Sequence, residues 1–455
     1  APEAAACKHG SFGLAHRNDI AAYFARVEEG RRAVDDLVAA DPQSLEAGPG
    51  VEDLSLKTIS EHASPVVKLV ASTLYDALKS GASDVHIECT GSGLAIKHRI
   101  DGVLTQAGQA QGAEMAERII SRIKVMAELD IAERRVPQDG RFKVSLKGRE
   151  VDFRVSIMPS IFGEDAVLRI LDKQALADEF KGLRLEALGV DPASMAWLRK
   201  LANEPYGMLL VTGPTGSGKT TTLYAILSEI HRGNDKIITI EDPVEYQLPG
   251  ILQIPVNEKK GLTFARGLRS ILRHDPDKIM VGEIRDGDTA QIAVQSALTG
   301  HLVFTTVHAN NVFDVIGRFL HMGVDPYSFT AALNGVMAQR LVRINCIHCS
   351  VEEHPDAALL ASSGLNGDAV RSVSFKTGRG CGQCRGSGYR GRKAIAETML
   401  LNDELRELIA TRQPIRAIKD AARKLGTRDL REAALDLVRS GETTLTEINR
   451  VTFVA

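Results

Sequence analysis

Apolar residues follow two different spacings in the first half of the chain, and each spacing predicts a different element. Ser64 and Pro65 supply a cap and a first-turn proline for a helix whose apolar face runs to Gly81. Helical spacing returns at residues 114–128. Strict alternation of apolar and polar residues predicts strands at 84–88, 95–102 and 149–156. We therefore expect a small α/β domain over residues 61–172.

The middle of the chain shows short, continuous apolar runs instead of alternation. Helix-length segments separate the runs, which lie at residues 208–211, 237–240, 279–281 and 302–307. Parallel strands have this appearance because helices cover both faces of their sheet. The pattern predicts a parallel α/β core over residues 201–340.

The remaining segments complete the expected domain organisation. Residues 1–60 hold one helical stretch, at 20–37, followed by proline and glycine breakers, and we interpret them as a remnant domain and linker. The chain starts at Ala1 without a methionine, so we expect that a preceding segment is missing. The other expected units are a charged, helical connector at 173–200, a cysteine-bearing subdomain at 341–395, and a helical subdomain at 396–455 with helices near 403–409, 414–425 and 427–438.

Composition narrows the class of protein. The 455 residues are 44% hydrophobic, which is enough to bury several cores. The formal charge is −2, so nothing global points to a nucleic-acid partner. No apolar run approaches the roughly 18 residues of a membrane span, so we expect any membrane contact to be peripheral.

One segment has the spacing of a phosphate-binding loop: Gly213-Pro-Thr-Gly-Ser-Gly-Lys219-Thr220. Its glycines free backbone N–H groups to surround phosphates, Lys219 brings a positive charge to the β and γ oxygens, and Thr220 can hold Mg²⁺. An apolar run precedes the loop and an amphipathic helical pattern follows it, as the motif requires. The predicted nucleotide contacts are Gly213, Pro214, Thr215, Gly216, Ser217, Gly218, Lys219, Thr220 and Thr221.

Polar residues follow the other three apolar runs, where an open α/β sheet binds its ligands. Phosphoryl transfer depends mainly on positioning and charge neutralisation. We assign Glu283 to orienting the attacking water, Glu241 to organising metal or water, and His308 to sensing the γ-phosphate. For each acid, the alternative is a solvated strand end. For His301, a structural loop histidine is as open an interpretation as a contact in the site.

Four of the six cysteines form two Cys-x-x-Cys pairs, Cys346 with Cys349 and Cys381 with Cys384. Two such turns commonly supply four thiolates to a tetrahedral Zn²⁺, and a filled ligand set indicates a structural site. Disulfides or free thiols are the alternatives, and a nearby histidine, His348 or His354, could replace a thiolate. Cys7 and Cys89 show no partner pattern and are expected to be ordinary thiols.

Three arginines, Arg266, Arg269 and Arg273, share one face of a predicted helix whose other face is apolar. Such a stripe is often merely solvated. Because it lies between the acidic strand ends in sequence, an ATP contact is an equally open interpretation.

These segments together resemble the secretion ATPase superfamily, in its type II secretion and type IV pilus assembly branch. In that family, residues 213–220, 238–246, 281–286 and 300–309 correspond to the Walker A motif, the Asp box, the Walker B motif and the His box. The similarity extends from about residue 64 to 450. It implies a RecA-like P-loop ATPase core preceded by a small PAS-like α/β domain, with a zinc-knuckle insertion and C-terminal helices.

The resemblance also implies cofactors, partners and further site residues. ATP, Mg²⁺ and Zn²⁺ are the expected ligands, and a homo-hexamer that docks on inner-membrane components from the cytoplasm is the expected assembly. The family resemblance also favours Arg266 and Arg269 as ATP contacts. In the 61–172 domain, Arg141 and Arg154 are the expected donors to a γ-phosphate, with a plain solvated role as the alternative.

Two classes of function remain at this stage. The first is a motor ATPase for pilus assembly or type II export, which the four-cysteine insertion favours over a retraction motor. The second is a DNA-uptake or other nucleic-acid-handling P-loop ATPase. A nucleic-acid surface concentrates basic and aromatic residues, whereas aromatics are 5% here and charge is balanced. We therefore expect no direct nucleic-acid partner.

Overall fold

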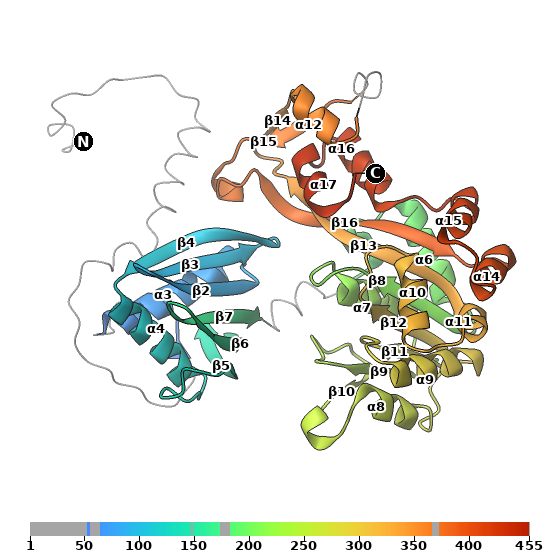
Figure 1. The fold of residues 1–455 in the computed structure, drawn as a ribbon, viewed down its shortest axis with the longest axis horizontal. Coiled ribbons are helices and arrows are strands. Elements are labelled where there is room, and N and C mark those ends of the chain that lie inside the picture. The colour runs from blue at the N-terminus through green and yellow to red at the C-terminus, as the bar shows by residue number, and fades with distance from the viewer. Residues whose placement is uncertain (1–51, 55–63, 147–148, 173–182, 366–372, 455) are drawn as a thin grey trace.

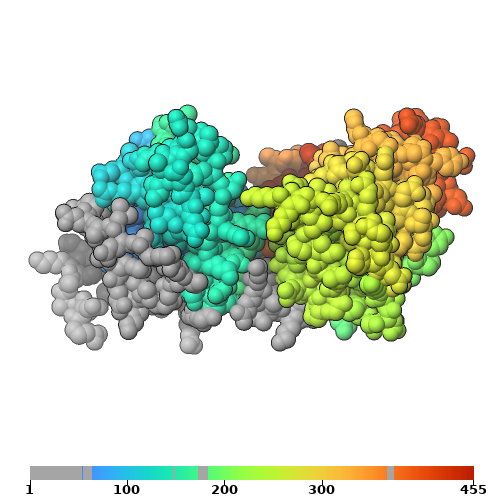
Figure 2. All heavy atoms as spheres, turned by 90° about the horizontal axis from the view of Figure 1, so that it is seen from below, coloured from blue at the N-terminus to red at the C-terminus, as the bar shows by residue number. Residues whose placement is uncertain are grey.

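The computed structural model describes residues 52–54, 64–146, 149–172, 183–365 and 373–454 as two lobes (Figure 1). Figure 2 shows the N-terminal lobe, in blue to teal, beside the green and yellow part of the second lobe. Among these residues, no helix combines the length and the apolar character that crossing a membrane requires. The helical stretch predicted at 20–37 lies outside the described residues.

A seven-stranded sheet with two covering helices forms the N-terminal lobe in the described part of the chain. Its strand order is β1-β5-β6-β7-β2-β3-β4, and every pairing is antiparallel except β1 with β5. The elements are β1 (Glu52–Asp53), α3 (Pro65–Ser80), β2 (Asp84–Thr90), β3 (Gly93–Ile100), β4 (Val103–Gln111), α4 (Ala113–Met126), β5 (Gln138–Leu146), β6 (Arg149–Ser160) and β7 (Gly163–Leu171).

Burial in this lobe follows the predicted periods. Helix α3 begins at Pro65 and ends at Ser80, and it is capped by Gly81, whose φ of 67° suits a residue without Cβ. Along β6, alternate side chains are buried and the residues between them face outward. Strands β1, β4, β5 and β7 were not predicted, and for β4 the mostly exposed, polar sequence explains why alternation failed to reveal it.

The second lobe is built on a sheet in which all four predicted apolar runs are strands. The order is β10-β9-β11-β12-β8-β13-β16, parallel throughout except for β16. The strands are β8 (Gly207–Thr212), β9 (Ile237–Glu241), β10 (Leu252–Pro255), β11 (Lys278–Val281), β12 (Leu302–Val307), β13 (Leu333–Asn345) and β16 (Tyr389–Leu400).

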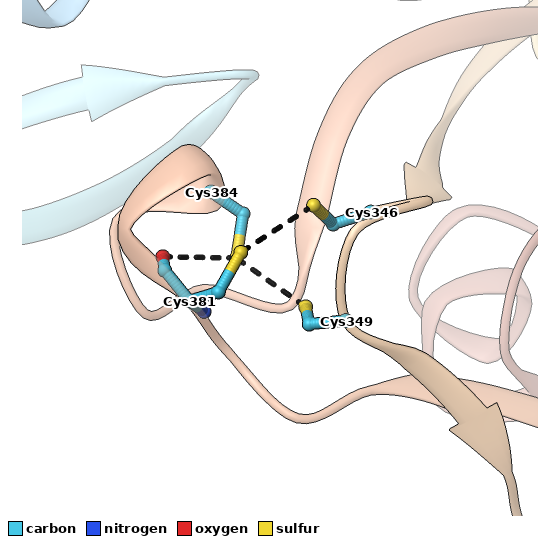
Figure 3. Close-up of side chains that lie close together, drawn as sticks. All are labelled: Cys346, Cys349, Cys381 and Cys384. Carbon is cyan, nitrogen blue, oxygen red and sulfur yellow. Dashed lines mark hydrogen bonds between the residues drawn. The ribbon is translucent and has the colours of Figure 1, made fainter. Parts of the chain in front are cut away.

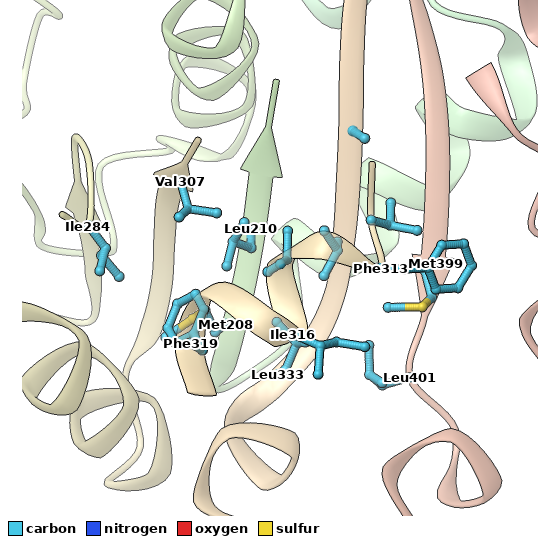
Figure 4. Packing of buried hydrophobic residues seen from close by; sticks show 14 of the residues in the cluster. Met208, Leu210, Ile284, Val307, Phe313, Ile316, Phe319, Leu333, Met399 and Leu401 are labelled. Carbon is cyan, nitrogen blue, oxygen red and sulfur yellow. The ribbon is translucent and has the colours of Figure 1, made fainter. Parts of the chain in front are cut away.

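Helices cover both faces of this sheet, which is why the strands at its centre are mainly apolar. On β8, Met208 and Leu210 enter one core, and Leu209 and Val211 enter the other. Figure 4 shows Met208 and Leu210 in the first core with Phe319 and Leu333. The covering helices are α6 (Pro192–Ala202) and α7 (Lys219–Ile230) on one side, and α8 (Phe264–Ile271), α9 (Gly287–Leu298), α10 (Asp314–His321) and α11 (Pro326–Ala332) on the other.

The cysteine segment is inserted between two paired strands. Strand β13 pairs with β16 from Gly335 opposite Leu400 to Asn345 opposite Tyr389. Both strands cross an expected domain boundary, at 340/341 and 395/396, because both belong to the core sheet. The smaller elements are η3 (Leu185–Leu188), η4 (Glu258–Lys260), β14 (Ser350–Glu352), α12 (Ala357–Ser362), β15 (Lys376–Gly378), η5 (Gly382–Cys384), α14 (Asp403–Ala410), α15 (Ile415–Lys424), α16 (Leu430–Arg439) and α17 (Leu445–Val451).

The inserted segment also contacts the N-terminal lobe. Arg385, directly after η5, donates to the backbone carbonyls of Lys79 (2.7 Å) and Ser80, in the last turn of α3. A guanidinium is stabilising there because unpaired carbonyls and the helix dipole make a helix C-terminus electronegative. An ion pair between Arg392 Nε and Asp101 Oδ1, at 3.3 Å, lies at the same junction.

Candidate nucleotide site and zinc site

The phosphate-binding loop connects β8 to the first residue of α7, as its motif predicts. A Cβ on Gly213 would lie 2.5 Å from the carbonyl oxygen of Gln339, and a Cβ on Gly218, whose φ is 85°, would lie 2.9 Å from Gln339 Nε2. Both positions therefore need glycine. The loop ends where the first N–H groups of a helix lack intrahelical partners, so its backbone fits a phosphate group.

Lys219 is folded onto its own loop. Its Nζ donates to the carbonyl oxygens of Gly213 (2.9 Å) and Pro214 (3.1 Å). Burial lowers the pKa of Lys219; the charge of Glu283 opposes this shift and that of Arg340 reinforces it. A nucleotide phosphate would offer the ammonium a stronger, charged acceptor than two carbonyls. Thr220, the predicted Mg²⁺ ligand, is exposed beside it.

Glu283 and His308 come from neighbouring strand ends and meet directly. His308 Nε2 lies 2.8 Å from Glu283 Oε1, and Arg285 Nε donates to Glu283 Oε2 at 2.7 Å. The Glu283 side chain is 14% exposed, whereas His308 is 44% exposed. Each carboxylate oxygen keeps a second lone pair, so Glu283 can still accept a hydrogen bond from water.

Glu241 has a different environment from the pair above. It is 2% exposed and accepts hydrogen bonds from Tyr224 Oη, from Thr239 Oγ1 at 2.5 Å and from Gln253 Nε2 at 3.1 Å. These partners are neutral and belong to α7, β9 and β10. Glu241 therefore connects these three elements of the core through hydrogen bonds. Its assigned role in organising metal or water stays a prediction.

The arginines of α8 have local partners. Arg266 donates to the carbonyl of Gly261 at 3.2 Å, and Arg269 lies 3.9 Å from Asp288 of α9. The ATP contact expected for both stays a prediction.

His301 precedes β12, so it lies at the sheet edge opposite His308. Its Nδ1 is 3.0 Å from the carbonyl oxygen of Ser296, as is typical of a structural loop histidine.

The N-terminal lobe carries a row of arginines across one face of its sheet. In cross-strand register, Arg141 lies opposite Arg154, Arg154 opposite Arg169, and Arg169 opposite Asp84. Directly opposed residues point to the same face. Arg169 pairs with Asp84 at 3.1 Å. Among the described residues, no carboxylate lies within ion-pair distance of Arg141 or Arg154.

Two arginines of this row, Arg154 and Arg169, act electrostatically on a carboxyl group of the core lobe. Glu245 follows β9, and desolvation raises the pKa of its carboxyl while the charges of Arg154 and Arg169 act against the shift. Sequence reasoning assigned Arg154 but missed Arg169. Its position is evident once β6 and β7 are aligned, because the two arginines are then direct neighbours.

The four predicted zinc ligands converge at one point (Figure 3). The Sγ–Sγ distances are 3.8 Å for Cys346–Cys381 and 3.7 Å for both Cys349–Cys384 and Cys381–Cys384. A zinc ion with Zn–S bonds of about 2.3 Å has tetrahedral edges of about 3.8 Å, so the donor set fits Zn²⁺. Such spacing is far too long for a disulfide.

Backbone N–H groups favour the thiolate form of one of the four cysteines, Cys384. Burial alone would raise its pKa, but the N–H groups of Cys381 (3.1 Å) and Gly388 (3.3 Å) donate to its sulfur and, with the Cys349 and Cys381 thiols, lower the pKa to about 7. Burial raises the pKa of Cys346 and of Cys349, so those two thiols are deprotonated less readily before a metal binds. A metal ligand must be deprotonated, so the hydrogen bonds to Cys384 favour binding. We propose a structural Zn²⁺ site with four protein ligands.

We predict one Zn²⁺ per chain, measured by elemental analysis of protein prepared without added metal. Cys381→Ser should remove the zinc and lower the melting temperature, because the site contributes to the folding of the inserted segment. Cys89→Ser is the matched control, since Cys89 lies in the N-terminal lobe and should leave zinc content unchanged. Less than half an equivalent of zinc, or a disulfide among the four cysteines in reducing buffer, would contradict the site.

Comparison with known proteins agrees with this geometry. The family described as "Type II/IV secretion system protein" matches residues 60–450. The chain is 45% identical to the type II secretion system protein E of Pseudomonas aeruginosa (89% of this chain, 78% of the relative). It is 43% identical to the type IV pilus assembly ATPase PilB of Myxococcus xanthus (89% and 74%).

Solved structures at lower identity are similar to this chain in fold. The pilus retraction motor PilT, crystallised with ADP, is 27% identical with a TM-score of 0.53, over 83% of this chain and 95% of that one. The ATPase DotB of Legionella pneumophila is 20% identical with a TM-score of 0.58, over 84% and 94%, and supports the fold. On the family match and the identity to its relatives, the chain belongs to the type II/IV secretion system protein family.

Proposed function

We propose that this protein is a motor ATPase that hydrolyses ATP to drive pilus or pseudopilus assembly, or type II export across the bacterial envelope. The observation that carries the proposal is the convergence of Lys219, Glu283 and His308 at the carboxyl edge of the core sheet. Family membership makes the chain an ATP-hydrolysing enzyme, and the relatives named above serve these two kinds of machine.

In this mechanism each residue acts on a different part of the reaction. Lys219 leaves its two carbonyl acceptors and neutralises charge on the β- and γ-phosphates. Glu283 accepts a hydrogen bond from the attacking water. His308, paired with the same carboxylate, contacts the γ-phosphate and so makes the position of Glu283 depend on the bound nucleotide. Bound Mg²⁺, held by Thr220, would polarise the phosphate oxygens.

Arg141 and Arg154 are the proposed cationic donors from the N-terminal lobe. Arginine suits a phosphate because its planar fork offers two parallel hydrogen bonds. Their lack of a carboxylate partner within the described ranges leaves their charge available, and Arg154 already acts on Glu245 of the core. We further propose Arg266 and Arg269 as contacts from α8, within a homo-hexameric ring whose lobes rearrange around the nucleotide.

The remaining part of the proposal concerns location and partners. We propose that the ring works in the cytoplasm, docks through a protein partner on inner-membrane components, and binds no nucleic acid directly. Closure of the lobes around ATP would then move the docked partner. Identities of 45% and 43% to the two relatives leave both the type II and the pilus systems as candidates.

Lys219→Ala and Glu283→Gln should give separable defects. We expect the first to remove most ATP affinity, because phosphate charge is lost. The second should bind ATP normally and hydrolyse it about 100-fold or more slowly, because water is no longer oriented by a carboxylate. Calorimetric titration with the ATP analogue AMP-PNP and steady-state phosphate release measure the two effects.

Glu407→Gln is the matched control, since this exposed glutamate of α14 has the same chemistry away from the loop. It should leave both measurements unchanged. Turnover of Glu283→Gln within a few-fold of the unmodified protein would remove Glu283 from the water-orienting role and direct attention to Glu241.

Arg154→Ala should bind ATP yet hydrolyse it poorly, and activity should require the ring. Arg118→Ala is the matched control, because Arg118 lies on α4 of the same lobe and pairs with Glu114. Turnover per chain should fall on dilution as light scattering detects dissociation. Full activity in a stable monomer, or a silent Arg154→Ala, would contradict this part of the proposal.

A further inference from the structure

Two adjacent residues of β13, Gln339 and Arg340, lie where the sheet meets the nucleotide site. The last residue of β13 in register with β8 is Ala338, opposite Thr212, and the phosphate-binding loop starts directly after Thr212. Strand β13 continues beyond that point. Gln339 and Arg340 therefore stand beside the two loops that leave β8 and β12, and successive strand residues point to opposite faces.

Gln339 is wholly buried and holds the phosphate-binding loop through both ends of its amide. Its Nε2 donates to the carbonyl of Ser217 at 2.7 Å, and its Oε1 accepts from Thr222 Oγ1 at 2.7 Å. The Ser217 carbonyl can only accept a hydrogen bond, so it fixes Nε2 as the end of the amide that faces it. The close approach that requires glycine at 213 and 218 is to this same residue.

Arg340 holds the loop that follows His308. Its Nη2 donates to the carbonyl of Asn310 at 3.0 Å, and its Nη1 donates to the carbonyl of Gln339 at 3.2 Å. The Gln339 carbonyl that it binds lies against Gly213, so the guanidinium stands next to the phosphate-binding loop as well. One half-buried side chain thus connects the His308 loop with the part of β13 that packs on the phosphate-binding loop.

Strand β16 reaches the same loop from the other side of β13. Glu397, opposite Ala338 and 3% exposed, accepts from the backbone N–H of Val312 at 3.3 Å. Arg340 is two residues beyond Ala338 on the same face of β13, so it is a diagonal cross-strand neighbour of Glu397. The β13–β16 pair therefore contacts both ends of the segment 310–312.

We propose that Gln339 and Arg340 are positioning residues for ATP hydrolysis. Gln339 sets the phosphate-binding loop, Arg340 sets the loop that carries His308, and the two loops keep a fixed relation because adjacent residues of one strand hold them. The inference rests on the proposed nucleotide site. Because β13 leads into Cys346, it also gives the zinc segment a direct structural connection to both loops.

Gln339→Glu tests the first half of the inference. The substitution keeps the shape but replaces the N–H donor to Ser217 with an oxygen, so the loop should lose its position. Titration calorimetry with ADP and with AMP-PNP should show both dissociation constants rising about tenfold or more. Asn334→Asp is the matched control: Asn334 lies at the far end of β13 and its amide donates to the carbonyl of Tyr206 at 2.8 Å.

If Gln339→Glu does not fold, Thr222→Val and Gln339→Met replace it, because each removes one side of the same contact with little change of volume. Their melting temperatures give the effect on stability separately. Weakened binding of both nucleotides at an unchanged zinc content supports the inference. A lower melting temperature with unchanged dissociation constants for ADP and AMP-PNP would overturn the positioning role of Gln339. An equal loss of nucleotide affinity in Asn334→Asp would overturn it as well.

Arg340→Gln tests the second half. ADP affinity should stay within about twofold, while turnover falls at least tenfold and the preference for AMP-PNP over ADP decreases. Arg340→Lys should recover part of both, since lysine can still donate to the Asn310 carbonyl. A wild-type preference and turnover in Arg340→Gln would overturn this half. Failure of the nucleotide site itself would be seen separately, as normal affinity in Lys219→Ala.

Discussion

Burial of both faces of one parallel sheet is the constraint on which the rest of the second lobe depends. Helices cover either side, so side chains along β8, β9, β11 and β12 are mainly apolar apart from buried threonines, and charged side chains lie at the strand ends. Parallel strands bring their carboxyl ends to one edge. That is why Glu283 and His308, 25 residues apart in sequence, form one hydrogen-bonded pair.

The N-terminal lobe differs from the second lobe because only one face of its sheet is buried. Its antiparallel sheet buries one face against two helices and leaves the other for charge, so a row of arginines can cross β5, β6 and β7 without entering a core. Asp84 balances Arg169 at one end of the row. Arg385 of the inserted zinc segment donates to a backbone carbonyl in the last turn of α3. This bond gives the N-terminal lobe a defined contact with the segment that β13 and β16 of the core sheet enclose.

Local patterns in the sequence predicted what local physics determines. The phosphate-binding loop, the four buried strands and the paired cysteines each depend on spacing within a short segment, and the structure contains all three. Strands β13 and β16 were missed, because a long strand with polar residues inside it shows neither clean alternation nor a continuous apolar run.

Contacts set by strand register could not be predicted from one sequence. Arg169 becomes a neighbour of Arg154 only after β6 and β7 are aligned, and Gln339 meets Ser217 only after β13 is placed beside β8. Two polar residues within the apolar run of β13 were the available signal for that second contact. Glu241 shows the converse, since its position after a strand indicated the site while its packing gives it neutral, buried partners.

A crystal structure of the full chain with Mg²⁺ and AMP-PNP tests the nucleotide site most directly. We expect Lys219 Nζ to leave the carbonyls of Gly213 and Pro214 for the β- and γ-phosphate oxygens. We also expect an ordered water between Glu283 and the γ-phosphate. A nucleotide bound with Lys219 still on its own loop, or with Glu283 turned away from the γ-phosphate, would contradict the assignment of the site.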